Sequence, residues 1–67
     1  MSERNYFMQN LREGDDVYWY DPDDDVCSGM YTVDKIYDKP EDRCEETIVV
    51  IRNKAGSEVE AYMEEIA

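Results

Sequence analysis

The chain has 67 residues, and its eighteen Asp and Glu outnumber its seven Lys and Arg, which gives a formal net charge of -11. That charge argues against direct nucleic-acid binding, because proteins bind the phosphate backbone mainly through clustered Lys and Arg. The sequence has no His, the side chain most often used for proton transfer near neutral pH and for metal ligation. We therefore expect one small acidic domain that is not an enzyme and holds no cofactor or metal centre.

Other features of the composition indicate a folded protein. Aromatic residues make up 12% of the chain, which is more than a disordered acidic segment usually carries. A domain of about 60 residues buries only about 60% of its unfolded surface, so we expect modest stability and no deep cleft. The sequence contains no apolar run as long as that of a secretory signal, and none that approaches the roughly 20 residues needed to span a bilayer. We therefore expect a cytoplasmic protein without membrane association.

Short β-rich runs separated by turn residues predict an all-β fold for residues 11–67. The segment Met1–Asn10 shows no strand pattern, and we set it apart as an N-terminal segment that could be flexible. The first predicted strand is Asp16–Tyr20, entered through a turn at Gly14. The acidic segment that follows, Asp21–Asp25, contains a proline and four carboxylates, so we expect a solvated loop there.

Three further strands are expected. Met30–Tyr37 has inward residues that break strict alternation, which predicts a β-bulge near Asp34 and Lys35. Thr47–Arg52 is apolar on both faces and is therefore expected to be central and covered on each side. Glu58–Tyr62 alternates cleanly and is expected to follow a turn. The inward residues predicted for the strands are Val17, Trp19, Tyr31, Val33, Ile36, Val59 and Ala61.

The last residues are expected to close the core. Met63–Ile66 is compatible either with a short helical turn or with a last strand, and in both cases Ile66 points inward. The two thiols, Cys27 and Cys44, are expected to lie near opposite ends of one hairpin ladder. That placement exceeds the Cα separation of about 7 Å that a disulfide allows, so both should be free.

The order of these motifs resembles SH3-like barrels. A Leu-x-x-Gly-Asp turn at Leu11–Asp15 precedes a strand with Trp19, a Ser-Gly pair precedes a Tyr-x-Val strand, and a Glu-Val-Glu strand follows a long hairpin. The chain is similar, over Leu11–Ile66, to small uncharacterised barrels of gut bacteria and their mobile elements. The resemblance implies a five-stranded, strongly bent sheet. It also implies that the loop 21–29 stands where peptide-binding members carry an acidic specificity loop, although barrels of this class have many functions.

Two groups of side chains are candidates for partner binding: the loop carboxylates and the tyrosines of the first strand. The residues that we predict to bind a partner are Tyr18, Tyr20, Asp21, Asp23, Asp24 and Asp25. Exposed rings beside carboxylates could take an Arg-bearing, Pro-rich peptide or cage a cationic group. The leading hypothesis is thus a non-catalytic interaction module that binds a basic protein surface or peptide.

Each of these groups also has a simpler interpretation. The tyrosines, together with Tyr37 and Tyr62, could flank the doubly apolar strand as a minor second core, and the loop could serve solubility alone. Alternate aspartates resemble a calcium loop, but Val26 and Thr32 stand where such a loop needs Gly and Glu.

Two other functions stay open. Small acidic proteins of phages and mobile elements can mimic DNA and inhibit a nucleic-acid-binding protein, and the charge of this chain fits that role. The chain could also be a structural subunit whose Val49, Ile51 and Tyr faces are covered by a second copy. For the interaction module, we expect a monomer or a weak homodimer.

Overall fold

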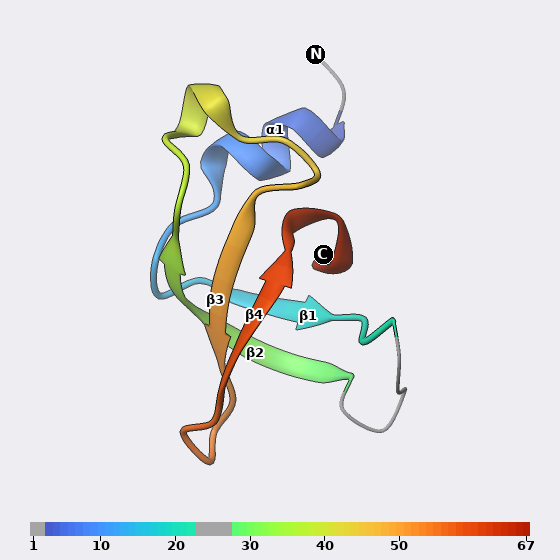
Figure 1. Cartoon of the computed structure of the whole chain (residues 1–67), viewed down its shortest axis with the longest axis vertical. Coiled ribbons are helices and arrows are strands. Elements are labelled where there is room, and N and C mark those ends of the chain that lie inside the picture. Colours follow the sequence, from blue (N-terminus) through green and yellow to red (C-terminus); the bar gives the residue numbers. More distant parts are fainter. Residues whose placement is uncertain (1–2, 23–27) are drawn as a thin grey trace.

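A computed structural model describes residues 3–22 and 28–67 of the chain, and its main element is an antiparallel sheet of four strands in the order β1-β2-β3-β4 (Figure 1). The strands are β1 (Asp16–Trp19), β2 (Gly29–Ile36), β3 (Ile48–Arg52) and β4 (Glu58–Tyr62). Helix α1 (Glu3–Asn10) precedes them, and two short 3-10 helices, η2 (Pro40–Asp42) and η3 (Met63–Glu65), follow β2 and β4. The four strands expected from the sequence are confirmed, each to within a residue or two at its ends.

Strand β2 contains the predicted bulge. Val33 pairs with Ile51, whereas Lys35 pairs with Val50, so the register shifts between Val33 and Lys35. A bulge bends a strand and increases its twist. In Figure 1, β2 accordingly runs beside β1 over its first half and then turns toward the end of the sheet where α1 lies.

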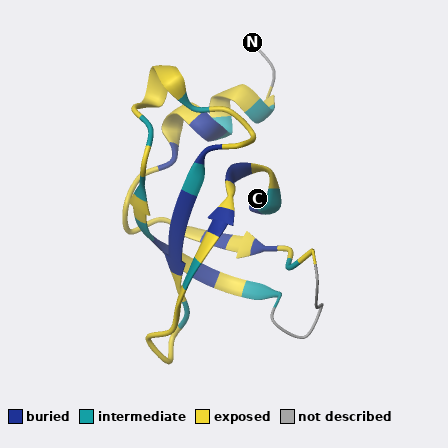
Figure 2. Cartoon of the chain, in the orientation of Figure 1, coloured by how far each residue is buried: buried dark blue, intermediate teal, exposed yellow. Residues whose placement is uncertain are grey.

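Strand β3 is central, as its two apolar faces predicted. Val49 and Ile51 are fully buried on the inner face, and Val50 on the outer face keeps only 8% of its surface exposed. The inner faces of the sheet form one core with α1 and η3, shown as the buried segments in Figure 2. That core consists of Met8, Leu11, Val17, Trp19, Tyr31, Val33, Val49, Ile51, Ala61, Met63 and Ile66, with Phe7, Ile36 and Val59 packed against it.

Trp19 is a core residue in this structure. Its ring meets that of Tyr31 edge to face at 5.4 Å, within the range favoured for aromatic pairs. The indole Nε1 donates a hydrogen bond to Glu65 at 3.0 Å, which satisfies its polar atom. The prediction that Val17 and Trp19 share the inward face of their strand is therefore confirmed.

The chain after β4 forms the helical turn η3, and Ile66 then closes the core at 1% exposure. Ile66 makes an isolated bridge with Trp19, and Tyr18 and Ala67 exchange two backbone hydrogen bonds of 2.9 Å. Because η3 occupies 63–65, the C-terminal segment contacts the backbone of the first strand and the residue after it only over Glu65, Ile66 and Ala67. Over the described residues the sheet thus has four strands and is open, so the expected five-stranded barrel is not confirmed.

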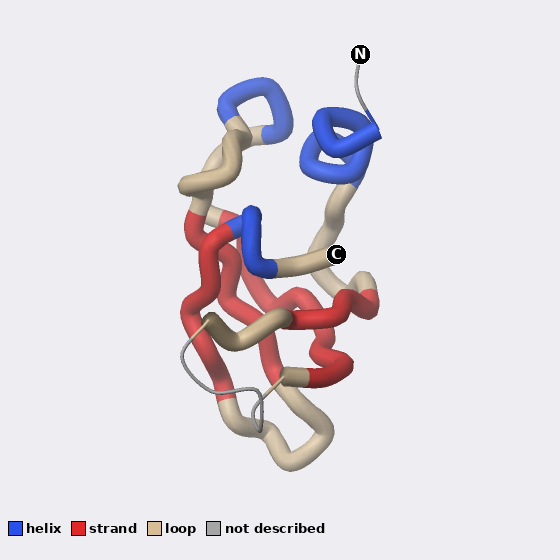
Figure 3. Tube along the Cα trace, turned by 90° about the vertical axis from the view of Figure 1, so that its right-hand side faces the viewer, coloured by secondary structure: helices blue, strands red, loops and turns tan. Residues whose placement is uncertain are grey.

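Helix α1 was not expected from the sequence. Its buried residue is Met8, and the chain after it inserts Leu11 into the core. The Arg43 guanidinium donates to the carbonyl oxygens of Met8 at 2.8 Å and Leu11 at 2.7 Å, which satisfies groups that a helix end leaves unpaired. The segment 1–10, set apart as one that could be flexible, is therefore helical over 3–10 and packs beside η2 at one end of the sheet (Figure 3).

Candidate functional site

The predicted partner-binding tyrosines lie on the outer face of the sheet. Successive side chains of a strand point to opposite faces, so burial of Val17 and Trp19 turns Tyr18 and Tyr20 outward. Tyr18 keeps 37% of its surface exposed and Tyr20 58%. Both rings are therefore available to a partner.

The backbone of these tyrosines is held in place by the C-terminal segment. The Tyr18 amide donates to the Ala67 carbonyl at 2.9 Å, and the Tyr20 amide donates to the Glu65 carbonyl at 2.8 Å. The two rings contact each other with their centroids 4.6 Å apart and their planes tilted by 53°. The outer side of β1 thus carries a paired aromatic surface on fixed backbone.

Met30 extends this surface onto the neighbouring strand. It pairs with Tyr18 in the β1–β2 register, and residues directly opposite in a sheet point to the same face. Met30 is 59% exposed. We call Tyr18, Tyr20 and Met30 the tyrosine patch.

Carboxylates flank the patch along β1. Asp16 lies two residues before Tyr18 on the same face, and its Oδ1 accepts a hydrogen bond from the Thr32 hydroxyl at 3.2 Å. Asp21 follows Tyr20 and is half-buried. Its amide donates to the Ser28 hydroxyl at 2.8 Å, which ties the two ends of the acidic loop together. Of the predicted acidic residues, Asp21 is described, whereas Asp23, Asp24 and Asp25 lie outside the described residues.

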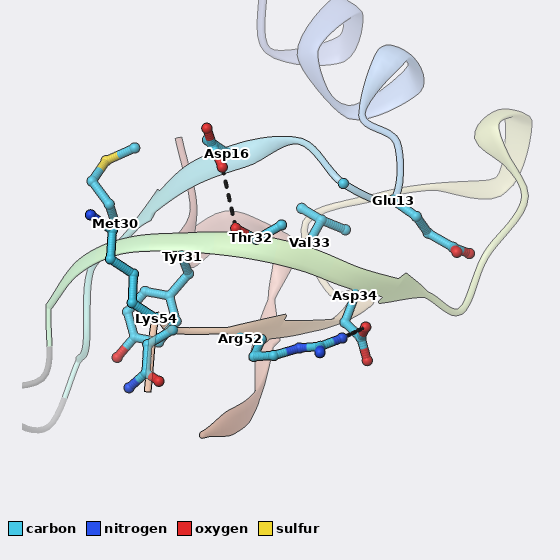
Figure 4. A pocket seen from close by; sticks show the side chains of 11 residues that line it. Glu13, Asp16, Met30, Tyr31, Thr32, Val33, Asp34, Arg52 and Lys54 are labelled. Atoms are coloured by element: carbon cyan, nitrogen blue, oxygen red, sulfur yellow. Dashed lines mark hydrogen bonds and ion pairs between the residues drawn. The ribbon is translucent and has the colours of Figure 1, made fainter. Parts of the chain in front are cut away.

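A shallow hollow of about 780 Å³ lies beside the patch, between β1, β2 and the β3–β4 hairpin (Figure 4). Asp16 and Met30 line it, and so do Arg52 and Lys54. Arg52 forms an ion pair with Asp34 on β2. Both partners are partly exposed, and such pairs contribute little to stability. The hollow therefore offers charges of both signs. No pattern in the sequence indicates that these cations lie beside the predicted acidic site.

The other two tyrosines named with them in the sequence, Tyr37 and Tyr62, form a separate row across the far side of the sheet. Ile48 pairs with Tyr62 on β4, and its carbonyl accepts the Tyr37 amide at 3.2 Å. Tyr37 is 54% exposed and Tyr62 47%, and the Lys35 ammonium lies 4.9 Å from the centre of the Tyr37 ring. The four tyrosines predicted on the outer face are thus divided into two pairs, a division that only the strand register reveals.

The remaining sequence features are placed as follows. Cys44 is an exposed free thiol, and Cys27 lies outside the described residues, as does the middle of the segment weighed as a calcium loop. Within the described part of the chain, the helices are too short and too polar to cross a bilayer.

Of the predicted site residues, Tyr18, Tyr20 and Asp21 follow one another at the end of β1, and Met30 and Asp16 are additions that the structure makes to them. Asp23, Asp24 and Asp25 lie outside the described residues, so the full set stays a prediction. Comparisons with protein-family models, with curated proteins and with solved structures found no match to this chain.

Proposed function

We propose that this chain is a non-catalytic interaction module that binds a basic peptide or protein surface through the tyrosine patch and the carboxylates of the loop 21–25. The observation that carries the proposal is the pair of exposed rings of Tyr18 and Tyr20, 4.6 Å apart. The rings stand between Asp16 and Asp21 in the chain. Faces of aromatic rings attract Lys and Arg, and neighbouring carboxylates pair with the same cations.

Contacts within the chain support this chemistry. Among the described residues, Arg4 lies 5.0 Å from the centre of the Phe7 ring, and Lys35 lies over Tyr37. In that same part of the chain, no Lys or Arg is positioned over Tyr18 or Tyr20. Their rings are therefore free of an intramolecular cation from the described residues, as are those of Tyr6 and Tyr62, but only Tyr18 and Tyr20 contact each other and are flanked by Asp16 and Asp21 in the chain.

The net charge of -11 supports a basic partner as well. A strong field of one sign accelerates association with a molecule of the opposite charge and makes the rate sensitive to salt. Specific geometry would come from the patch, because the Tyr18 and Tyr20 amides are fixed by hydrogen bonds to the C-terminal segment.

The finer fold assignment belongs to the same proposal. The strand order, a helical turn after β4 and a bridge from Ile66 back to β1 support a small SH3-like barrel. In it, the last residues would serve as a very short fifth strand. The tyrosine patch would then lie beside the loop that corresponds to the acidic specificity loop of peptide-binding members.

The test begins with peptides selected from a display library rich in Lys, Arg and Pro, whose dissociation constants are measured at low and high salt. Tyr20→Ala should weaken binding at least tenfold, whereas Tyr6→Ala should leave it unchanged, because Tyr6 is equally exposed (65%) but lies on α1. Neutralising Asp21, Asp23, Asp24 and Asp25 together should weaken binding more than neutralising Glu3, Glu41, Asp42 and Glu46. Equal effects of the two sets would contradict the proposed site, because net charge alone would then explain the binding.

DNA mimicry is the alternative outcome. If a nucleic-acid-binding protein is the partner found in a pull-down, added duplex DNA should displace it from a mimic but not from a peptide-binding module. In that case the Tyr20→Ala variant should also retain its affinity, since a mimic binds through carboxylates placed where phosphates would be.

A further inference from the structure

A second surface lies at the opposite edge of the sheet from the tyrosine patch. Strand β1 has β2 on one side and the C-terminal segment on the other, since Tyr18 and Ala67 exchange backbone hydrogen bonds. Strand β4 pairs only with β3 among the described elements. Its outer side is therefore the edge that the described chain leaves open.

The hydrogen bonds at both ends of the β3–β4 ladder identify the peptide groups that face this edge. The Asn53 amide donates to Ser57 at 3.0 Å, and the Met63 amide donates to Thr47 at 2.8 Å. In an antiparallel ladder, hydrogen-bonded pairs alternate with non-bonded pairs. Val59 and Ala61 therefore bond to β3, and the peptide groups at positions 58, 60 and 62 point away from it.

The same three residues carry the exposed side chains of the strand. Glu58, Glu60 and Tyr62 lie on the outer face, with Tyr62 47% exposed. Glu60 lies opposite the buried Val50, so β3 supplies no cation there. Glu58 lies opposite Arg52, whose ion pair is with Asp34. Unpaired peptide groups and carboxylates thus coincide at alternate positions of one edge.

We propose that the β4 edge binds a basic extended segment of another protein, which adds to the sheet as a further strand. Backbone hydrogen bonds to the peptide groups of 58, 60 and 62 would hold the segment, as in other cases of strand addition. Residues directly opposite in a ladder share a face, and opposite charges stabilise such pairs. The segment therefore carries Lys or Arg opposite Glu58 and Glu60, and an apolar residue opposite Tyr62.

The inner face adds an apolar requirement. Val59 is only half-buried although it packs against the core. A strand added to β4 would place one residue beside Val59, between its two basic residues. In the antiparallel direction the motif reads apolar-x-basic-apolar-basic.

A second copy of this chain does not fit the same edge. In the antiparallel register that uses all three residues, Glu60 would face Glu60, and like charges directly opposite each other are destabilising. The net charge of -11 on each copy adds further repulsion. Charge complementarity thus selects a basic strand, and this surface is independent of the tyrosine patch and of the function proposed for it.

The probe is a synthetic peptide with the core Ile-Thr-Arg-Val-Arg, titrated into the full 67-residue chain and followed by NMR and amide hydrogen exchange. Binding should slow exchange at the amides of Glu58, Glu60 and Tyr62. The amides of Val59 and Ala61, already bonded to β3, should change little. This alternation is the signature of strand addition, and a peptide that merely neutralises charge would not produce it.

Variants separate the contributions of charge and backbone. Glu60→Gln should weaken binding by a factor of up to about five, the upper end of the range for one cross-strand charge pair. Glu60→Pro removes both the carboxylate and the edge amide, so it should weaken binding more than Glu60→Gln. The fold should tolerate this proline, because an edge strand accepts proline where the lost amide faces solvent. The peptide N-methylated at both Arg residues should not bind. As a control for net charge, Glu41→Gln should match the unchanged protein.

Three results would overturn the proposal. If millimolar peptide leaves amide exchange at residues 58, 60 and 62 unchanged, the glutamates serve only to prevent the β4 edge from pairing with another strand. Self-association of the chain in sedimentation would show that a second copy, and not a basic strand of another protein, occupies the edge. Binding lost in Tyr20→Ala but kept in Glu60→Pro would move the peptide to the tyrosine patch. That last result would leave the proposed function standing.

Discussion

Removing the Arg43 guanidinium should release helix α1 from the rest of the fold. Arg43 bridges two parts of the chain that are far apart in sequence, since it donates to Met8 at 2.8 Å, to Leu11 at 2.7 Å and to Asp38 at 3.2 Å. All three acceptors are backbone carbonyls, and two belong to the last turn of α1 and the residues after it. A fourth contact, of 3.5 Å to the Gln9 carbonyl, is too long to add much. In Arg43→Ala these carbonyls lose their donor.

The expected cost follows from the number of bonds and the exposure of the site. A net hydrogen bond contributes about 0.5–1.5 kcal/mol, and more when one partner is charged. Arg43 is half-buried, so water can reach part of the site, and we take the lower part of that range for each of the three bonds. The sum is about 2 kcal/mol, which corresponds to a decrease in Tm of about 8–16 °C for a domain of this size.

Thermal and urea unfolding followed by circular dichroism would measure this cost. Arg43→Lys keeps the charge but not the planar fork of donors, so it should recover less than half of the loss. Arg12→Ala is the control, because Arg12 is exposed and makes its described hydrogen bonds through its backbone amide and carbonyl. If Arg43→Ala and Arg12→Ala lower stability by the same amount, the guanidinium does not anchor α1 and the reasoning fails.

Three further perturbations have expected outcomes. Gly56 has a φ of 88°, so Gly56→Ala should lower the free energy of unfolding by about 1 kcal/mol, and Gly56→Asn should recover much of that loss. An added Cβ meets nothing within 4 Å, which leaves backbone strain as the cause. Trp19→Phe removes the hydrogen bond to Glu65 and part of the core volume, so urea unfolding should show a loss of about 1–2 kcal/mol. Raising NaCl from about 10 mM to about 500 mM should raise Tm, because screening weakens the repulsion within a chain of net charge -11. An unchanged Tm would mean that the charges are too dispersed to lower the stability of the fold.

The strands could be predicted from the sequence because each has a local cause. The alternation of Val17 and Trp19 and the double apolar face of β3 follow from the two-residue period of a strand. The bulge in β2 followed from a break in that period, since Val33 and Ile36 cannot both face the core without an extra residue. These features need no knowledge of the rest of the chain.

Helix α1 could not be predicted because its cause is not local. Tyr6, Phe7 and Met8 are consecutive, so the segment shows no apolar stripe at helical spacing. A helix of 8 residues is also too short to be stable alone. It depends on burial of Met8 and on Arg43, which lies 35 residues further along the chain. Tertiary contacts of this kind leave no pattern in the sequence near the helix.

The division of the exposed tyrosines shows what strand register adds for function. Alternation alone places Tyr18, Tyr20, Tyr37 and Tyr62 on one outer face and does not separate them. Register assigns Tyr18 to the strand edge covered by the C-terminal segment and Tyr62 to the open edge. The two pairs therefore offer different chemistry to a partner. At Tyr18 and Tyr20 the backbone is already bonded, so recognition there depends on rings and carboxylates, whereas at Tyr62 the peptide groups themselves are available.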